Sequence, residues 1–141
     1  MTTTTLSNAT PSLTETVERL SQRFVPVLAR TALSSVFLLS GLTKLTQYEG
    51  TQAYMSSVGV PGALLPLVIA FEILAPLAVI FGWHARFAAF LLAGFSGLTA
   101  LLFHFDFSDQ IQTIMFMKNI AIAGGFGLVL AFGPGPFSLK T

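Results

Sequence analysis

Three charged residues lie within long apolar stretches of this sequence, at Arg30, Glu72 and Lys118. A charge at the centre of a bilayer costs about 2.5–3.5 kcal/mol on insertion scales, so such residues mark functional positions by default. The glutamate side chain is too short to reach the headgroups from mid-span, so Glu72 must pair with a cation, be protonated or face water. Pro76, four residues later, has no N–H for the Glu72 carbonyl, and a buried carboxyl beside a free carbonyl fits a small-molecule site or a proton site.

The sequence offers two partners for Glu72 and does not choose between them. Arg30 either snorkels to the nearer membrane surface or extends inward to Glu72. Lys118 is expected roughly three positions shallower than Glu72, a gap of about 5 Å that a lysine side chain can bridge. Whichever cation is left over needs a carbonyl, a water, or an anionic or quinone-like oxygen. The structural alternative is a buried ion pair that has no function other than to fix the helix register.

Neutral polar residues add to this set toward the predicted external side. Asn119 and Gln112 are seven positions apart and share a helix face. His104 ends an apolar stretch, either as a surface histidine or as a proton-exchange group at a cavity mouth. The other histidine, His84, is predicted about 30 Å away across the membrane. The two cannot share a metal ion or a haem iron, so no metal site is expected.

The composition indicates an integral membrane protein. Of 141 residues, 53% are hydrophobic and only 9% are charged, against a usual charged share of about 25%. The chain has no cysteine, which excludes disulfides, thiolate metal sites and thiol–disulfide relays. Seven scattered basic residues and a net charge of +1 give no basic face, so nucleic-acid binding is not expected.

Four apolar stretches are long enough to cross a bilayer as helices, which takes about 20 residues each. They run over about 24–45, 62–82, 87–105 and 111–132. The links after the second and third are short, so we predict an all-α, up-down-up-down four-helix bundle. The positive-inside rule predicts that both termini lie in the cytoplasm, and we expect a protein of the bacterial inner membrane. The basic residues expected on that side are Arg19, Arg23, Arg86 and Lys140, against Lys44 on the other.

Residues 1–23 are predicted to be a cytoplasmic tail, and 24–139 to be the transmembrane domain. Ser12 to Glu15 fits a capping box, and apolar residues then follow at helical spacing. This stretch is either a short amphipathic helix on the membrane surface or a helix that extends the first span. In the link 46–61, we expect a short external helix that is a lid or a passive connector. Gly124 and Gly125 are expected to face the packed interior.

The chain resembles the DoxX family of small four-helix membrane proteins. The resemblance lies in RTALSSVFLLSGLTKL (30–45), SVGVPGALLPLVIAFEILAPLAVIFGWHARFAA (57–89) and QTIMFMKNIAIAGGFGLVLAFGPGPFSL (112–139). The residues that carry it, in order, are Arg30, Gly41, Lys44, Glu72, Lys118-Asn119, Gly124-Gly125 and Gly133-x-Gly135-x-x-Ser138. The family is similar to a subunit of a thiosulfate:quinone oxidoreductase, and its members are associated with quinones or oxidative-stress responses.

The resemblance therefore implies a quinone- or quinol-associated redox subunit or binding protein. Arg30, Glu72 and Lys118 would line the site, with Lys118 donating to a quinone oxygen and Glu72 handling the proton. The chain carries no intrinsic cofactor in this reading, its ligand would be a quinone, and a membrane or peripheral oxidoreductase subunit would be its partner. Catalytic residues and a homo-oligomer stay open. The alternative is a non-enzymatic assembly, partner-binding or small permeation protein whose buried charges are structural.

Overall fold

The predicted all-α membrane architecture is confirmed by the computed structural model, which describes residues 12–139. Four segments in that range are long and apolar enough to cross a membrane, and their ends lie close to the predicted ones, apart from the earlier start of the first helix. The elements are α1 (Leu13–Thr46), α2 (Tyr48–Ser57), the 3-10 helix η1 (Gly62–Leu64), α3 (Leu65–Phe81), α4 (Ala85–Phe103) and α5 (Gln110–Phe132).

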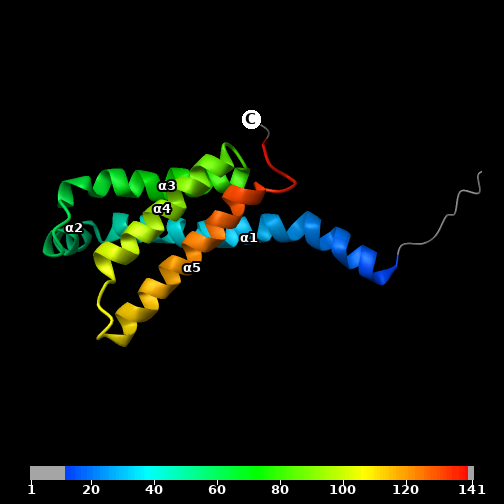
Figure 1. Ribbon diagram of the computed structural model, residues 1–141. Coiled ribbons are helices and arrows are strands. Elements are labelled where there is room, and N and C mark those ends of the chain that lie inside the picture. The colour runs from blue at the N-terminus through cyan, green and yellow to red at the C-terminus, as the bar shows by residue number, and fades with distance from the viewer. Residues whose placement is uncertain (1–11, 140–141) are drawn as a thin grey trace, which may run out of the picture.

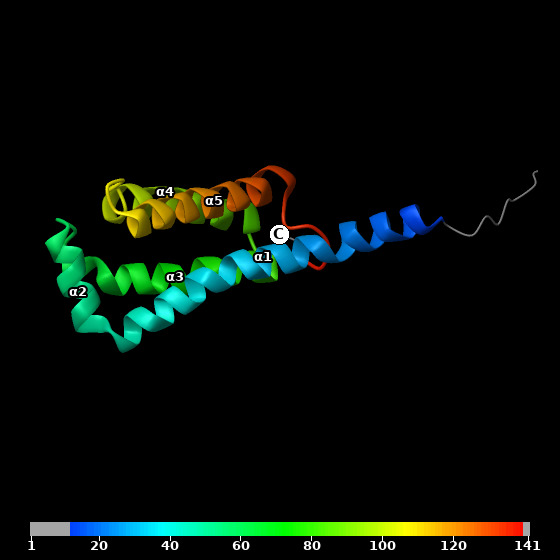
Figure 2. The same cartoon turned by 90° about the horizontal axis from the view of Figure 1, so that it is seen from below.

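The long helices form two pairs. α1 packs along α3, and α4 packs along α5, so that the bundle shows two layers in Figure 2. α3 and α4 join the layers, whereas α1 and α5 meet only briefly. Figure 1 shows α5 diverging from α1 toward the end of the bundle where α2 lies. We call this the α2 end, and the opposite one the terminal end.

The C-terminal segment returns to α1 at the terminal end. The rings of Phe24 and Phe137 stack at 6.2 Å between centroids, which brings the C-terminal segment against α1. The side of the membrane that this end faces stays a prediction, and residues 1–11 and Lys140 lie outside the described residues.

α1 is one continuous helix of 34 residues. The predicted capping box is present: the Glu15 amide donates to Ser12 Oγ at 3.2 Å, and the Ser12 amide donates to the Glu15 carboxylate at 3.0 Å. The predicted boundary between residues 23 and 24 falls inside the helix, because nothing there ends it and Pro26 is accommodated within it. The first turns of α1 project beyond the other helices in Figures 1 and 2.

Short, well-defined turns set the antiparallel order. Gly82 ends α3 with φ of 75°, a left-handed conformation that glycine adopts at little cost. At the other end of α4, Asp109 caps α5 by accepting the Ile111 amide at 2.7 Å. Because these links are short, adjacent helices must run in opposite directions.

Small residues allow close packing at particular points rather than along a whole face. A Cβ added to Gly125 would lie 2.9 Å from the Leu33 side chain, whereas a Cβ on Gly124 would meet nothing within 4 Å. Only Gly125 of this pair therefore faces the packed interior, because consecutive helix positions point about 100° apart. The core nearby includes Phe37, Leu92 and Phe126.

Candidate functional site

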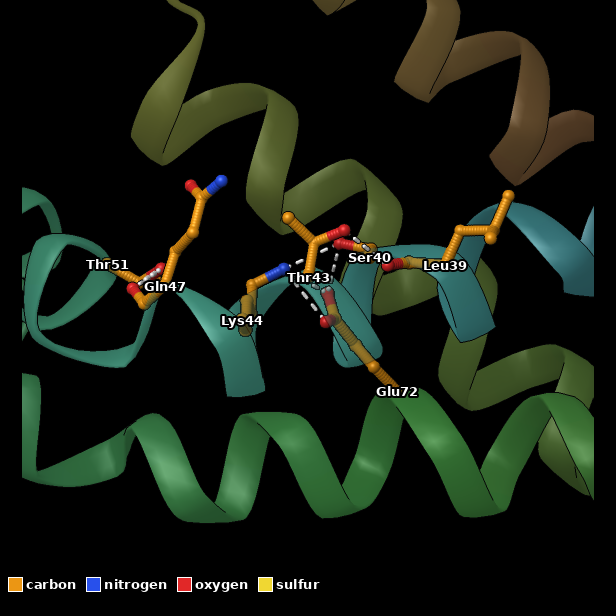
Figure 3. A network of polar contacts seen from close by, with 7 residues as sticks. All are labelled: Leu39, Ser40, Thr43, Lys44, Gln47, Thr51 and Glu72. Carbon is orange, nitrogen blue, oxygen red and sulfur yellow. Dashed lines mark hydrogen bonds and ion pairs between the residues drawn. The ribbon is translucent and has the colours of Figure 1, made fainter.

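A buried ion pair between α1 and α3 lies at the centre of the site. Lys44 Nζ lies 2.8 Å from Glu72 Oε2 and 2.9 Å from Oε1. Ser40, one turn before Lys44, accepts from Lys44 Nζ at 2.6 Å and donates to Glu72 Oε1 at 3.3 Å. Figure 3 shows the three side chains converging between the two helices. The Glu72 side chain is only 4% exposed, so this network supplies its charge compensation.

Neither predicted partner of Glu72 is the observed one. Gly41 brings α1 and α3 together at this level, since a Cβ there would lie 3.2 Å from Glu72 Cβ. Lys44 lies one turn beyond Gly41, which is within reach of a lysine side chain. Arg30 lies eleven positions from Gly41, or about 16 Å along the helix axis, and this distance excludes it as a partner.

Arg30 is instead buried at the terminal end, with 2% of its surface exposed. Its guanidinium donates to the backbone oxygens of Pro134 and Phe137, the latter at 2.6 Å. It neither snorkels nor lines the Glu72 site, so both expectations for Arg30 are wrong. The physical reason is that the C-terminal segment folds back over α1 and presents carbonyl oxygens to the cation.

A cavity of about 420 Å³ lies beside the ion pair. Residues from α1, α2, α3, α4 and α5 line it, and most are apolar, among them Phe37, Met55 and Phe95. Its polar lining residues are Ser40, Lys44, Thr51, Tyr54, Glu72, Thr99, His104, Lys118 and Asn119. Tertiary structure thus brings together four of the six predicted site residues: Glu72, His104, Lys118 and Asn119.

Lys118 lines this cavity without an acidic partner in the described part of the chain. The one ion pair found over residues 12–139 is that of Lys44 and Glu72. The Lys118 ammonium contacts the sulfur of Met115, one turn earlier, at 3.2 Å. A thioether is a weak acceptor, so the ammonium keeps donors for an oxygen within the cavity.

Asn119 has a packing role. Its side-chain amide donates to the Met115 carbonyl at 3.0 Å, and Ser96 Oγ on α4 donates to the Asn119 backbone oxygen at 2.9 Å. The bond from Ser96 holds α4 against α5 at the level of the cavity, whereas the bond to Met115 lies within α5. They leave Lys118, the adjacent residue, to face the open volume.

His104 and Gln112 form a pair near the α4–α5 link. His104 Nδ1 lies 2.8 Å from Gln112 Oε1, and Nδ1 is the donor of this contact because an amide oxygen only accepts. His104 lines the cavity, whereas Gln112 does not. In the same link, hydrogen bonds from Ser108 hold the pKa of the Asp106 carboxyl below its ordinary value.

No group of histidine, cysteine and acidic side chains within residues 12–139 is arranged to hold a metal ion. The polar groups of the cavity are two ammonium groups, a compensated carboxylate, an imidazole, an amide and hydroxyls. Such groups donate and accept hydrogen bonds and move protons. The arrangement therefore fits a small amphiphilic molecule with polar oxygens and an apolar body.

The sequence profile of DoxX matches residues 25–105, which run from α1 to the end of α4. The chain belongs to the DoxX family. The matched residues include Lys44, Glu72 and His104, so most of the site lies in the part of the chain that the family shares. Lys118 and Asn119, on α5, fall after the matched residues.

Two relatives from Escherichia coli (strain K12) support the assignment. The DoxX-family chain is 46% identical over 113 residues to Inner membrane protein YqjF, covering 80% of this chain and 87% of the relative. It is 33% identical over 120 residues to Inner membrane protein YphA, covering 80% and 86%. No solved structure matches the chain. With its four spans, the chain is a multi-pass inner-membrane protein.

Sequence reasoning missed Lys44 as the partner of Glu72, although a signal was present. Ser40 and Lys44 are four positions apart and therefore share a helix face. A hydroxyl one turn from a lysine, at the end of a span, indicates a polar face directed into the bundle. The cavity residues from α2, Thr51 and Tyr54, carried no comparable signal.

Proposed function

We propose that this DoxX-family protein is a membrane binding protein or subunit for a quinone or quinol. The observation that supports the proposal is the cavity of about 420 Å³ with apolar walls and an unpaired ammonium. Its volume falls within the range of about 300–1,000 Å³ usual for small-molecule sites. A quinone ring is flat and apolar, with carbonyl oxygens at its edge that accept hydrogen bonds.

Lys118 is the first contact in this proposal. Its ammonium has three donors and no acceptor, which complements a carbonyl oxygen. The aromatic side chains of Phe37 and Phe95, both in the lining, offer apolar faces to the ring. The ligand would exchange the weak Lys118–Met115 contact for a stronger hydrogen bond to oxygen.

Glu72 and His104 are the proposed proton-handling groups. Conversion of a quinone to a quinol takes up two electrons and two protons. The electrons would come from a partner oxidoreductase, and the protons would pass through the titratable groups that line the cavity. Lys44 and Ser40 hold the Glu72 carboxylate in place, so these two are positioning residues.

A non-enzymatic role is the second candidate, and the closed ion pair favours it. Lys44 and Ser40 compensate Glu72 without any ligand, as expected if the charges only fix how α1 and α3 pack. This candidate leaves Lys118 without a function, because its ammonium takes no part in that network. Lys118 is therefore the residue that separates the two proposals.

The decisive experiment is extraction of co-purifying lipids, followed by mass spectrometry. The wild type is purified in mild detergent beside Lys118→Met, Glu72→Gln and Lys118→Arg. We expect the wild type to retain a quinone, the first two variants to lose it, and Lys118→Arg to retain part of it because the donor remains.

Ile114→Met serves as the matched control, since Ile114 is an exposed residue on the same helix. It should retain the quinone as the wild type does. If no quinone co-purifies with any of these proteins, and added quinone does not bind to the wild type, the binding proposal fails. A loss of thermal stability in Glu72→Gln alone would then favour the structural role.

A further inference from the structure

We propose that residues 13–24 of α1 lie on the membrane surface at the terminal end, after α1 bends outward at Pro26. The inference does not depend on the ligand of the cavity. It concerns the part of α1 that projects beyond the bundle (Figures 1 and 2). The partner is the lipid bilayer that already surrounds the spans.

The projecting segment has one apolar face and one polar face. Leu13, Val17, Leu20 and Phe24 form an apolar stripe, with exposed fractions from 87% to 48%. At about 100° per residue, these four positions lie within about 60° of one another. Glu15, Glu18 and Gln22 fall on the opposite side. A helix with this distribution binds at the boundary between headgroups and acyl chains.

The stripe continues the lipid-facing surface of α1. Leu28, Leu42 and Leu45 are each more than half exposed, and they point within about 60° of the direction of the stripe. The same side of the helix is therefore apolar and exposed in the segment and in the span, apart from the contact of Phe24 with Phe137. Because the stripe is continuous with the lipid-facing surface of the span, we infer that lipid covers the stripe as well.

Pro26 lies on the opposite side and supplies the bend. It faces the C-terminal segment, since a Cβ added to Gly135 would lie 2.5 Å from Pro26 Cβ. Proline has no N–H for the Gln22 carbonyl, and its ring crowds the preceding turn on its own side. A kink at Pro26 opens the inner side, so the segment swings outward, away from the bundle.

An outward swing puts the stripe on the membrane. When a helix below the membrane tilts away from the bundle, its outer face turns upward to the bilayer. The outer face is the one that carries Leu13, Val17, Leu20 and Phe24. An inward swing would turn the polar face toward the bilayer instead. Only the outward direction set by Pro26 brings the apolar stripe to the membrane.

The length of α1 agrees with this geometry. Its 34 residues would span about 51 Å, whereas the hydrocarbon core is about 30 Å thick. The excess corresponds to about 14 residues, close to the length of the projecting segment. A second copy is a weaker occupant, because the stripe covers less than two heptads and a coiled coil needs three to four.

Labels on the two faces of the segment test the proposal. The chain has no cysteine, so Leu20→Cys and Gln22→Cys each accept a single environment-sensitive fluorophore in the full-length protein. In vesicles of brominated phosphatidylcholine and phosphatidylglycerol, we expect several-fold stronger quenching and a blue-shifted emission at position 20. Adding Pro26→Ala to Leu20→Cys should reduce that quenching, with helicity checked by circular dichroism.

Equal, weak quenching at both positions would mean that the segment projects into water, and it would overturn the proposal. Energy transfer between copies labelled at position 20, without lipid quenching, would assign the stripe to a second copy and would also overturn it. Strong quenching at position 20 that Pro26→Ala leaves unchanged would overturn the role of Pro26 as the hinge.

Discussion

The two ends of the bundle place their cations in different surroundings: Arg30 is buried, whereas Lys44 is half-buried and Lys118 is exposed. At the terminal end, Arg30 is enclosed by the C-terminal segment and donates to its carbonyl oxygens. At the α2 end, Lys44 and Lys118 border a cavity of about 420 Å³, and Lys118 has no acidic partner within residues 12–139. Arg30 fastens the C-terminal segment to α1. Lys44 and Lys118 instead border a volume that a ligand can fill.

The difference shows that a charge within a span does not by itself indicate a binding site. All three intramembrane charges looked equivalent as residue types. What separates them is the group that compensates each one: backbone carbonyls for Arg30, an ion pair for Glu72, and only a thioether for Lys118. A functional assignment therefore depends on which donors remain unused next to open volume.

The largest expected effect comes from removing one half of the ion pair. Glu72→Leu leaves the half-buried Lys44 ammonium, with 23% of its side chain exposed, without compensation and should lower the free energy of unfolding by up to about 3–5 kcal/mol. Lys44→Met combined with Glu72→Leu should recover most of that loss, because two apolar side chains replace both charges. Steric-trapping measurements in bicelles would give these values. A double variant as unstable as the single one would contradict an isolated pair.

At the terminal end, Arg30→Gln should cost about 2–3 kcal/mol, since hydrogen bonds from a charged donor are the strong ones. The C-terminal segment should then become accessible to proteases, while ligand retention stays at the wild-type level. Limited proteolysis with the lipid extraction described above would check both. If Arg30→Gln loses the ligand yet keeps the segment protected, the division between the two ends is wrong.

A matched glycine pair tests the close approach that lets Lys44 reach Glu72. Gly41→Ala should be less stable than Gly124→Ala by about 1–2 kcal/mol. The added methyl at Gly41 meets Glu72 and Ile73 at 3.2 Å, whereas the one at Gly124 meets nothing within 4 Å. Both changes alter helix propensity alike, so the difference in thermal unfolding isolates the packing. Equal stabilities would mean that α1 and α3 can separate without loss.

The smallest effect on stability is expected at the residue proposed to matter most for binding. Lys118→Met should change the free energy of unfolding by no more than about 0.5 kcal/mol or raise it, because the ammonium compensates no charge within residues 12–139. The same variant should lose the co-purifying quinone. A large loss of stability in Lys118→Met would instead make Lys118 a packing residue.

Much of the fold could be predicted because membrane helices obey strong local constraints. A span needs about 20 apolar residues, and its backbone must satisfy its own hydrogen bonds. The second to fourth spans, the short helix before Pro61 and the capping box at Ser12 therefore follow from residues close in sequence. Of the six candidate site residues, Glu72, His104, Lys118 and Asn119 line one cavity, whereas Arg30 and Gln112 do not.

The pairing of the charges could not be predicted in the same way. Depth along each span gave Arg30 and Lys118 as partners of Glu72, because it ignored how the helices rotate and how closely they approach. Gly41 decides the approach of α1 to α3, and Lys44 then lies within reach of Glu72. The return of the C-terminal segment to Arg30 joins residues more than 100 positions apart, which no local pattern encodes.

The sequence alone determined that this chain is a four-span membrane protein with costly charges at depth. Composition and hydrophobic length dictate that outcome whatever the packing. Tertiary structure alone decided that Arg30 is held by backbone carbonyls, that Lys44 pairs with Glu72, and that Lys118 borders open volume. The reason is that compensation of a charge is a short-range contact, made within about 3 Å, and such contacts exist only after helix rotation and approach are fixed.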